Sequence, residues 1–169
     1  MIAMPTRPPE PVAGPERAQL EAWLDFHRAT LLMKCAELDA EQLTTRAIPP
    51  SNLSLLGLLQ HMTLVEVWWF DCVLLDSPTE LPFSSDDDRD AEFNDFVATP
   101  EEVARLFLAA CARSRELAAP LALDVTTARV GRENVLDLRW VYTHMIEEYA
   151  RHNGHADLLR EVIDGRTGL

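Results

Sequence analysis

The segment DLRWVYTHMIEEYARHNGHADLLREVIDG, residues 137–165, decides the fold expected for this chain. Its apolar residues recur mostly at three- and four-residue steps, as they do along one face of an α-helix. Asp137 is a favourable N-cap and Gly165 a favourable C-terminal stop. The segment therefore predicts one long helix with a single buried stripe, formed by Leu138, Val141, Met145, Tyr149, Ala156, Leu159 and Ile163.

Three further helices are expected upstream. An apolar face recurs along 16–38, a nearly all-round apolar surface follows a cap at Ser51 or Ser54 and continues to about Leu75, and a third pattern begins after Thr99 and stops by Pro120. No run shows the alternation typical of a β-strand. A helix that is apolar nearly all round must be covered on most sides, so 51–75 is expected at the centre of an all-α four-helix bundle.

Three other segments are expected to lack helix, whereas AEQL at 40–43 could add a helical turn after the first helix. Residues 1–15 contain five prolines and predict a disordered, flexible N-terminal arm. The rest, 16–169, has the length of one folded domain. The acidic stretch 84–96 is interpreted as an exposed loop, because aspartate runs are usually solvated and no EF-hand spacing is present. Residues 121–136 are interpreted as a connection.

Composition narrows the class of function. The 169 residues carry a formal charge of −13, which disfavours nucleic acids and anionic membranes as partners. No stretch approaches the roughly 18 apolar residues needed to span a bilayer, and the N-terminus lacks the apolar core of a signal peptide. We therefore expect a soluble, cytoplasmic protein.

The three cysteines (Cys35, Cys72 and Cys111) are widely spaced and each falls in an apolar helical segment. That placement favours core packing over a disulfide framework or a catalytic thiol.

Chemistry-bearing residues occur on the last helix. Glu148 and His152 are four residues apart, which is the spacing by which one helix gives two ligands to one metal. His152 lies within the apolar arc and Glu148 at its border, whereas Glu147 projects outside it. A carboxylate that faces a core is costly unless it is paired or bound to a cation.

His61 supplies a matching feature on 51–75, because it is titratable and lies among Leu58, Val65 and Trp69. Two imidazoles and a carboxylate form a ligand set suited to zinc, and nickel, iron or manganese are acceptable alternatives. Three protein ligands would leave a position for water or substrate. The plainer readings are hydrogen-bonded core histidines and a Glu148–His152 ion pair.

Four other residues are candidates for surrounding the metal ligands or lining a pocket. His27 lies on the apolar face of 16–38, and Trp69 lies two turns after His61. His144 and His155 lie near the stripe of the last helix, but about 16 Å apart along it, so both cannot bind one metal. For these histidines an exposed or structural role is the plainer alternative.

The chain resembles the DinB-like superfamily of metal-binding four-helix bundles, and within it an actinobacterial branch of unknown function related to mycothiol-dependent enzymes. The resemblance covers about 16–168 and is most specific in 137–165. Members commonly have one histidine on the second helix, matched here by His61, and an H-x-x-x-H-x-G-Q signature on the last. Here that signature is EYARHNGH, 148–155, with glutamate for the first histidine and histidine for glutamine.

The His/Glu/His set resembles that of mycothiol-dependent members such as maleylpyruvate isomerase. The resemblance implies an up-down-down-up bundle with the metal at one end of the core, and thiol-transferase chemistry with mycothiol. Gly154 matches the glycine of the signature; within a helix it costs about 1 kcal/mol relative to alanine, so a packing or ligand reason is expected.

The leading hypothesis is a metal-dependent S-transferase that joins a small-molecule thiol to a small electrophile. A metal-dependent hydrolase with the same ligands is an alternative. A non-catalytic metal-binding or stress-related bundle protein is another. A homodimer is left open, and the sequence does not decide whether the chain is an enzyme.

Overall fold

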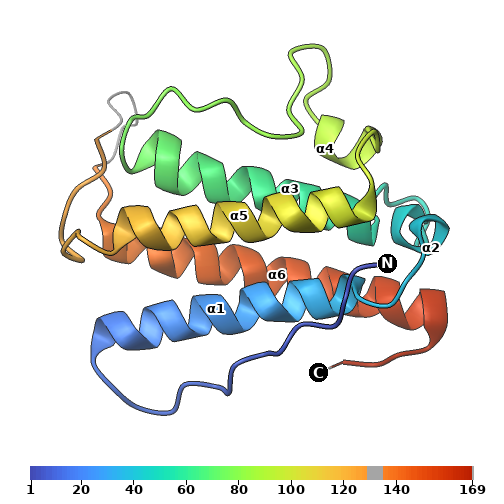
Figure 1. The fold of residues 1–169 in the computed structure, drawn as a ribbon, viewed down its shortest axis with the longest axis horizontal. Helices are drawn as coiled ribbons and strands as arrows, with labels where there is room; N and C mark the ends of the chain where they lie inside the picture. Colours follow the sequence, from blue (N-terminus) through green and yellow to red (C-terminus); the bar gives the residue numbers. More distant parts are fainter. Residues whose placement is uncertain (129–134, 169) are drawn as a thin grey trace.

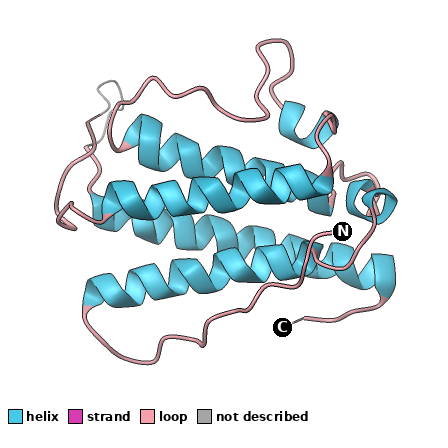
Figure 2. Cartoon of the chain, viewed as in Figure 1, coloured by secondary structure: helices cyan, strands magenta, loops and turns pink. Residues whose placement is uncertain are grey.

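The computed structural model describes residues 1–128 and 135–168. Within these ranges it contains six α-helices, one π-helical segment and no strand, apart from an isolated bridge between Thr126 and Asp137 (Figure 2). The all-α prediction is therefore confirmed for the described residues. The elements are α1 (Glu16–Cys35), α2 (Ala40–Thr44), α3 (Leu55–Val67), η1 (Trp68–Val73), α4 (Ala91–Asn94), α5 (Pro100–Ala118) and α6 (Leu138–Asp164).

Four long helices, α1, α3, α5 and α6, lie side by side (Figure 1). In this view α1 and α6 run in one direction along the chain, and α3 and α5 run in the other. Helix α1 packs against α6, α3 packs against α5, and α3 also contacts α6 and α1. The apolar helix α3 thus has neighbours on several sides, as its composition requires.

The predicted helix starts are confirmed by hydrogen bonds at the caps. The Asp137 side chain accepts from the Trp140 N–H at 2.7 Å, and Thr99 accepts from the Glu102 N–H at 3.3 Å. Helix α6 ends at Asp164 and is followed by Gly165, whose φ of 79° is left-handed and suits glycine. In its described parts the expected connection 121–136 contains no helix before α6; residues 129–134 lie outside them.

The helix expected over 51–75 is shorter and less regular than predicted. Its last turns form the π-helical segment η1, and residues 74 and 75 are not helical; of the two expected caps, Ser54 is the one that precedes α3. Within η1, Asp71 is buried and accepts from the Nε–H of Arg113 at 2.8 Å. A segment that is apolar nearly all round shows no period, so its sequence could not distinguish a π-turn from an α-turn.

The prediction of an exposed loop at 84–96 is wrong in part, because it contains α4. There Ala91 and Glu92 are buried. The buried Gln60 side chain on α3 donates to the backbone oxygens of Glu92 at 2.8 Å and Asp95 at 3.0 Å. Helix α4 therefore covers part of α3, and the need to cover that apolar helix outweighs the local preference of an acidic run for solvent.

The N-terminal arm contains no helix, as its prolines predict, but it contacts the folded helices. Ile2 is buried, and its carbonyl oxygen accepts from the Glu37 N–H at 3.0 Å. The Arg7 guanidinium lies over the Phe26 ring, 4.6 Å from its centroid. The predicted disorder of the arm is not confirmed.

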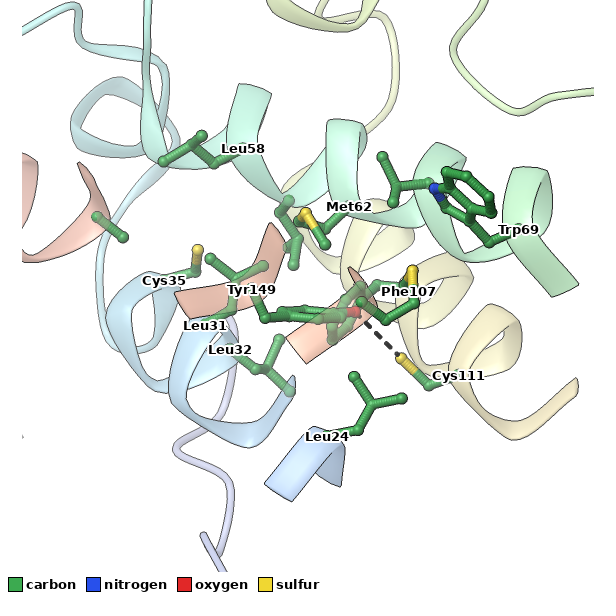
Figure 3. Packing of buried hydrophobic residues seen from close by; sticks show 14 of the residues in the cluster. Leu24, Leu31, Leu32, Cys35, Leu58, Met62, Trp69, Phe107, Cys111 and Tyr149 are labelled. Carbon is green, nitrogen blue, oxygen red and sulfur yellow. Dashed lines mark hydrogen bonds between the residues drawn. The ribbon is translucent and has the colours of Figure 1, made fainter. Parts of the chain in front are cut away.

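Tyr149 occupies the centre of the core, where side chains from several helices surround its ring (Figure 3). Its hydroxyl donates to Glu66 Oε1 at 2.7 Å and lies 3.9 Å from the Cys111 sulfur. This buried contact fixes the rotation of α6 about its axis. No helix in the described part of the chain is both long and apolar enough to cross a membrane.

Candidate metal centre

Three predicted ligands from two helices come together in the structure. His61 on α3, with Glu148 and His152 on α6, can each offer one donor atom such that all three atoms lie within 4.8 Å of one another. The rings of His61 and His152 are 4.8 Å apart between centroids, and His152 Nε2 lies 3.4 Å from Glu148 Oε2. The arrangement can accommodate one divalent cation between two imidazoles and a carboxylate.

The two adjacent glutamates differ in exposure as helical phase predicts. The Glu148 side chain is 17% exposed and the Glu147 side chain is 51% exposed. Glu147 forms an ion pair with Arg151 one turn further along α6. The group of three donors that contains His61 and His152 includes Glu148 and not Glu147.

His152 has the protonation state that a metal ligand needs. Burial lowers its pKa to about 4, and the positive charge that His61, His155 and Arg151 can carry lowers it in the same direction. A neutral imidazole at neutral pH keeps a lone pair for a metal. The donor set therefore fits a divalent metal in both composition and protonation.

Three of the four other predicted site residues lie beside these donors. His155 Nδ1 is 3.4 Å from His152 Nδ1. His144 Nε2 is 3.5 Å from Glu148 Oε1, and the His144 ring lies 4.6 Å from the ring of Trp69. Trp69 belongs to η1, so the π-helical segment contributes to the surroundings of Glu148.

The fourth, His27, has different neighbours. Its backbone oxygen accepts from Asn153 Nδ2 at 3.1 Å, its Nδ1 lies 3.4 Å from the same atom, and its ring stacks on Trp23. Burial lowers its pKa. Its contact with Asn153, the residue after His152, makes it part of the α1–α6 packing.

A second group of donors shares Glu148 with the first. It consists of His144, Glu147 and Glu148, whose donor atoms also lie within 4.8 Å of one another. All three residues belong to α6, and Arg151 contacts both glutamates. A guanidinium at that position competes with a cation, so the group that includes His61 is the better candidate for a metal site.

A fourth chemical group lies at the site and was not among the predicted residues. Glu92 on α4 lies 3.1 Å from His61 Nδ1. The signal in the sequence is weak. Ala91 and Phe93 interrupt the acidic run 84–96, which indicates that part of this segment is buried. Nothing in the local sequence indicates which residues it contacts.

A cavity of about 190 Å³ between α1 and α5 is a rival location for a ligand. Arg28 lines it, yet its guanidinium already donates to both Glu66 oxygens, at 2.8 and 2.7 Å, and to Asp25 at 2.9 Å. An arginine with these partners is not free for an anionic ligand. The cavity is therefore a weaker candidate for a ligand site than the group of three donors.

The cysteines do not offer an activated thiol. All three are buried. Burial raises the pKa of Cys35 to about 12 and also raises that of Cys111 well above its usual value. A thiol held protonated is a poor nucleophile, so these two behave as the core residues that the sequence predicted.

Of the two reasons expected for Gly154, packing or a ligand, the structure contradicts the packing one. The residue is exposed, and a Cβ added there would meet no atom within 4 Å among the residues compared. Nothing in the packing of the described chain requires glycine at this position.

Gly154→Ala should accordingly raise the free energy of unfolding by about 0.5–1 kcal/mol, because alanine has the higher helix propensity. Urea denaturation of the chelator-treated protein measures the change. A lower stability would mean that the backbone of α6 is approached closely at this position.

The comparisons with known proteins agree in extent with this fold. A family model described as mycothiol-S-transferase matches residues 19–165, which is most of the chain. The matched span includes His61, Glu148, His152 and all of α4. No curated protein sequence matches the chain at a significant level.

Proposed function

The chain belongs to the mycothiol-S-transferase family, a DinB-like family, and from this premise we propose that it is a metal-dependent thiol S-transferase. The thiol substrate is mycothiol and the second substrate is a small electrophile. His61, Glu148 and His152 hold the metal, which is zinc, with nickel, iron or manganese as the alternatives.

One observation carries the metal dependence. The donor atoms of His61, Glu148 and His152 lie within 4.8 Å of one another, although His61 is far from the other two in the sequence. The lowered pKa of His152 supports the same assignment. Three protein ligands leave a coordination position for an external ligand, which is typical of catalytic rather than structural zinc sites.

The reaction we propose forms one carbon–sulfur bond. A divalent metal bound by the three residues would favour the thiolate form of a coordinated thiol. The thiol sulfur loses its proton and attacks an electrophilic carbon. With an organic halide the carbon–halogen bond breaks, the halide leaves with the bonding electrons, and the thiol proton is released to solvent. No cysteine of the chain is needed as a nucleophile.

The architecture of the proposed enzyme is an up-down-down-up four-helix bundle formed by residues 16–169. The directions of α1, α3, α5 and α6 support this order (Figure 1). His144, His155 and Trp69 surround the ligands on the side of α6 and η1.

Purified, untagged protein should contain divalent metal close to one equivalent per chain, measured by elemental analysis. With mycothiol and an activated organic halide it should form the thioether, and treatment with a chelator should abolish the reaction until metal is restored. Activity towards ester or amide substrates with water alone would favour a metal-dependent hydrolase instead. A protein that retains no metal after extensive dialysis against zinc would contradict the proposal.

A further inference from the structure

Helix α4 carries a carboxylate that is buried although it lies in an acidic, largely exposed segment. Glu92 is 8% exposed, whereas Asp90 and Asp95 on either side of it are exposed. A carboxylate removed from water needs a hydrogen-bond donor or a cation as its partner. Its partner is His61, whose Nδ1 lies 3.1 Å from Glu92 Oε1.

The contact specifies the tautomer of His61. A carboxylate oxygen accepts, so a hydrogen bond from the ring to Glu92 requires that His61 Nδ1 carry the proton. In a neutral imidazole the other nitrogen, Nε2, is then the one with a free lone pair. Phe93, the next residue on α4, stacks on the same ring with its centroid 5.1 Å away. Helix α4 thus contacts His61 both at the ring edge and across the ring face.

Contacts other than that of the Glu92 carboxylate also hold α4 in place. Gln60 donates to the backbone oxygen of Glu92 and to that of Asp95, which follows the helix. Arg46 donates to the Phe93 backbone oxygen at 3.2 Å and to Asn94 Oδ1 at 2.9 Å. Gly57 on α3 permits a close approach, since a Cβ there would lie 3.0 Å from the Phe93 ring. The carboxylate is therefore held against His61 by a supported helix.

Glu92 is not one of the three grouped donors. Although it is described in full, the group within 4.8 Å contains His61, Glu148 and His152 without it. It contacts the nitrogen of His61 that would face away from a cation bound at Nε2. This is the arrangement in which a carboxylate orients a metal-binding histidine and increases its basicity.

We propose that Glu92 is a positioning residue: it accepts the Nδ1–H of His61 and fixes this ring as the tautomer whose Nε2 is available to the metal. The inference rests on the proposed function in so far as it concerns the metal. The tautomer itself is a property of the metal-free chain.

Removing the carboxylate should weaken metal binding without removing a ligand. Glu92→Ala should lower the zinc association constant about 10- to 100-fold, the usual effect of losing such a partner. Glu92→Gln keeps an oxygen that accepts from Nδ1 but loses the charge, so its affinity should fall between those of Glu92→Ala and the unaltered protein. Asp87→Asn is the matched control, because it removes one charge from the same segment at an exposed side chain.

The experiment measures zinc affinity by competition with a chelator, and the His61 tautomer by NMR of the ¹⁵N-labelled imidazole in metal-free protein. Circular dichroism establishes that each variant remains folded. We expect His61 protonated at Nδ1 in the unaltered protein and in Glu92→Gln, and a mixture of tautomers in Glu92→Ala.

Two results would overturn the inference: a His61 ring protonated at Nε2 and not Nδ1 in the unaltered protein, or equal zinc affinity in Glu92→Ala and Asp87→Asn. If the unaltered protein binds no zinc, the proposed function fails, and the NMR measurement on the metal-free chain still decides whether Glu92 sets the tautomer.

Discussion

Glu148→Gln should weaken zinc binding by on the order of 100-fold or more, and Glu147→Gln should leave it nearly unchanged. Removing a residue that hydrogen-bonds to a metal ligand usually lowers the metal affinity 10- to 100-fold, and removing a ligand itself should lower it at least as much. Glutamine has the shape of glutamate but not its charge, so the comparison isolates the carboxylate. The two residues are adjacent, yet helical geometry turns them about 100° apart, and only Glu148 belongs to the group with His61 and His152.

Competition with a chromophoric chelator measures the affinities, and unfolding by urea shows that the substitutions act on the site. Glu148→His is a further variant, which should retain metal because imidazole is also a zinc ligand and the change restores the commoner signature of the superfamily. Loss of zinc from Glu147→Gln together with retention in Glu148→Gln would mean that the ligands come from another face of α6.

Helical periodicity explains why the sequence could predict this distinction. Along α6 the buried residues recur with one period from Leu138 to Leu159, so the phase of each intervening residue is determined. The same reasoning placed His152 towards the core. The proximity of His61 to Glu148 and His152 follows from a single further expectation, that the apolar helix α3 lies at the centre of the bundle.

The contribution of α4 could not be predicted in this way. Its four residues are too few to show a period, and Glu92 meets His61 only because Gln60 and Gly57 hold α4 against α3. Such a contact depends on how the segment 84–96 returns to the bundle. The sequence also gives no indication of the π-helical turn that carries Trp69, since that segment is apolar nearly all round and shows no helical period.

The ion pair between Arg28 and Glu66 was likewise not predicted, although it organises the centre of the molecule. Both side chains are buried, at 4% and 0% exposure. Glu66 also accepts from the hydroxyl of Tyr149, the residue that follows Glu148. Charged residues on separate helices carry no sequence signal of pairing, so only the packing reveals that α1, α3 and α6 meet through one carboxylate.

Arg28→Met should lower the free energy of unfolding by about 3–5 kcal/mol at pH 7, because it leaves the Glu66 carboxylate buried without its cation. Arg115→Met is the matched control. Arg115 also forms an ion pair, with Asp25 at 2.8 Å, but both side chains are substantially exposed, so its loss should cost about 1 kcal/mol or less. Urea denaturation of chelator-treated proteins measures both without a contribution from bound metal.

The pH dependence identifies the buried carboxylate as the cause. Burial acts to raise the pKa of Glu66, but Arg28 outweighs it, so the pKa lies below its usual value. The ionised pair therefore stabilises the fold above the pKa of an unfolded glutamate, and this stabilisation is lost as the pH falls through the lowered pKa of the folded state. Without Arg28 the remaining effect of burial should raise that pKa, so the deficit of Arg28→Met should be largest at neutral pH and should shrink on acidification.

Replacing Glu66 as well should restore stability. Arg28→Met/Glu66→Gln removes both charges while an amide oxygen can still accept from Tyr149, so the double variant should recover much of the stability that Arg28→Met loses at pH 7. Its deficit should not depend on pH between 5 and 7, because the double variant lacks the buried carboxylate and every other titratable group is the same as in the unaltered protein. If the double variant were as unstable as Arg28→Met, the loss would come from the volume and contacts of the arginine side chain, and the carboxylate would not be the group that requires Arg28.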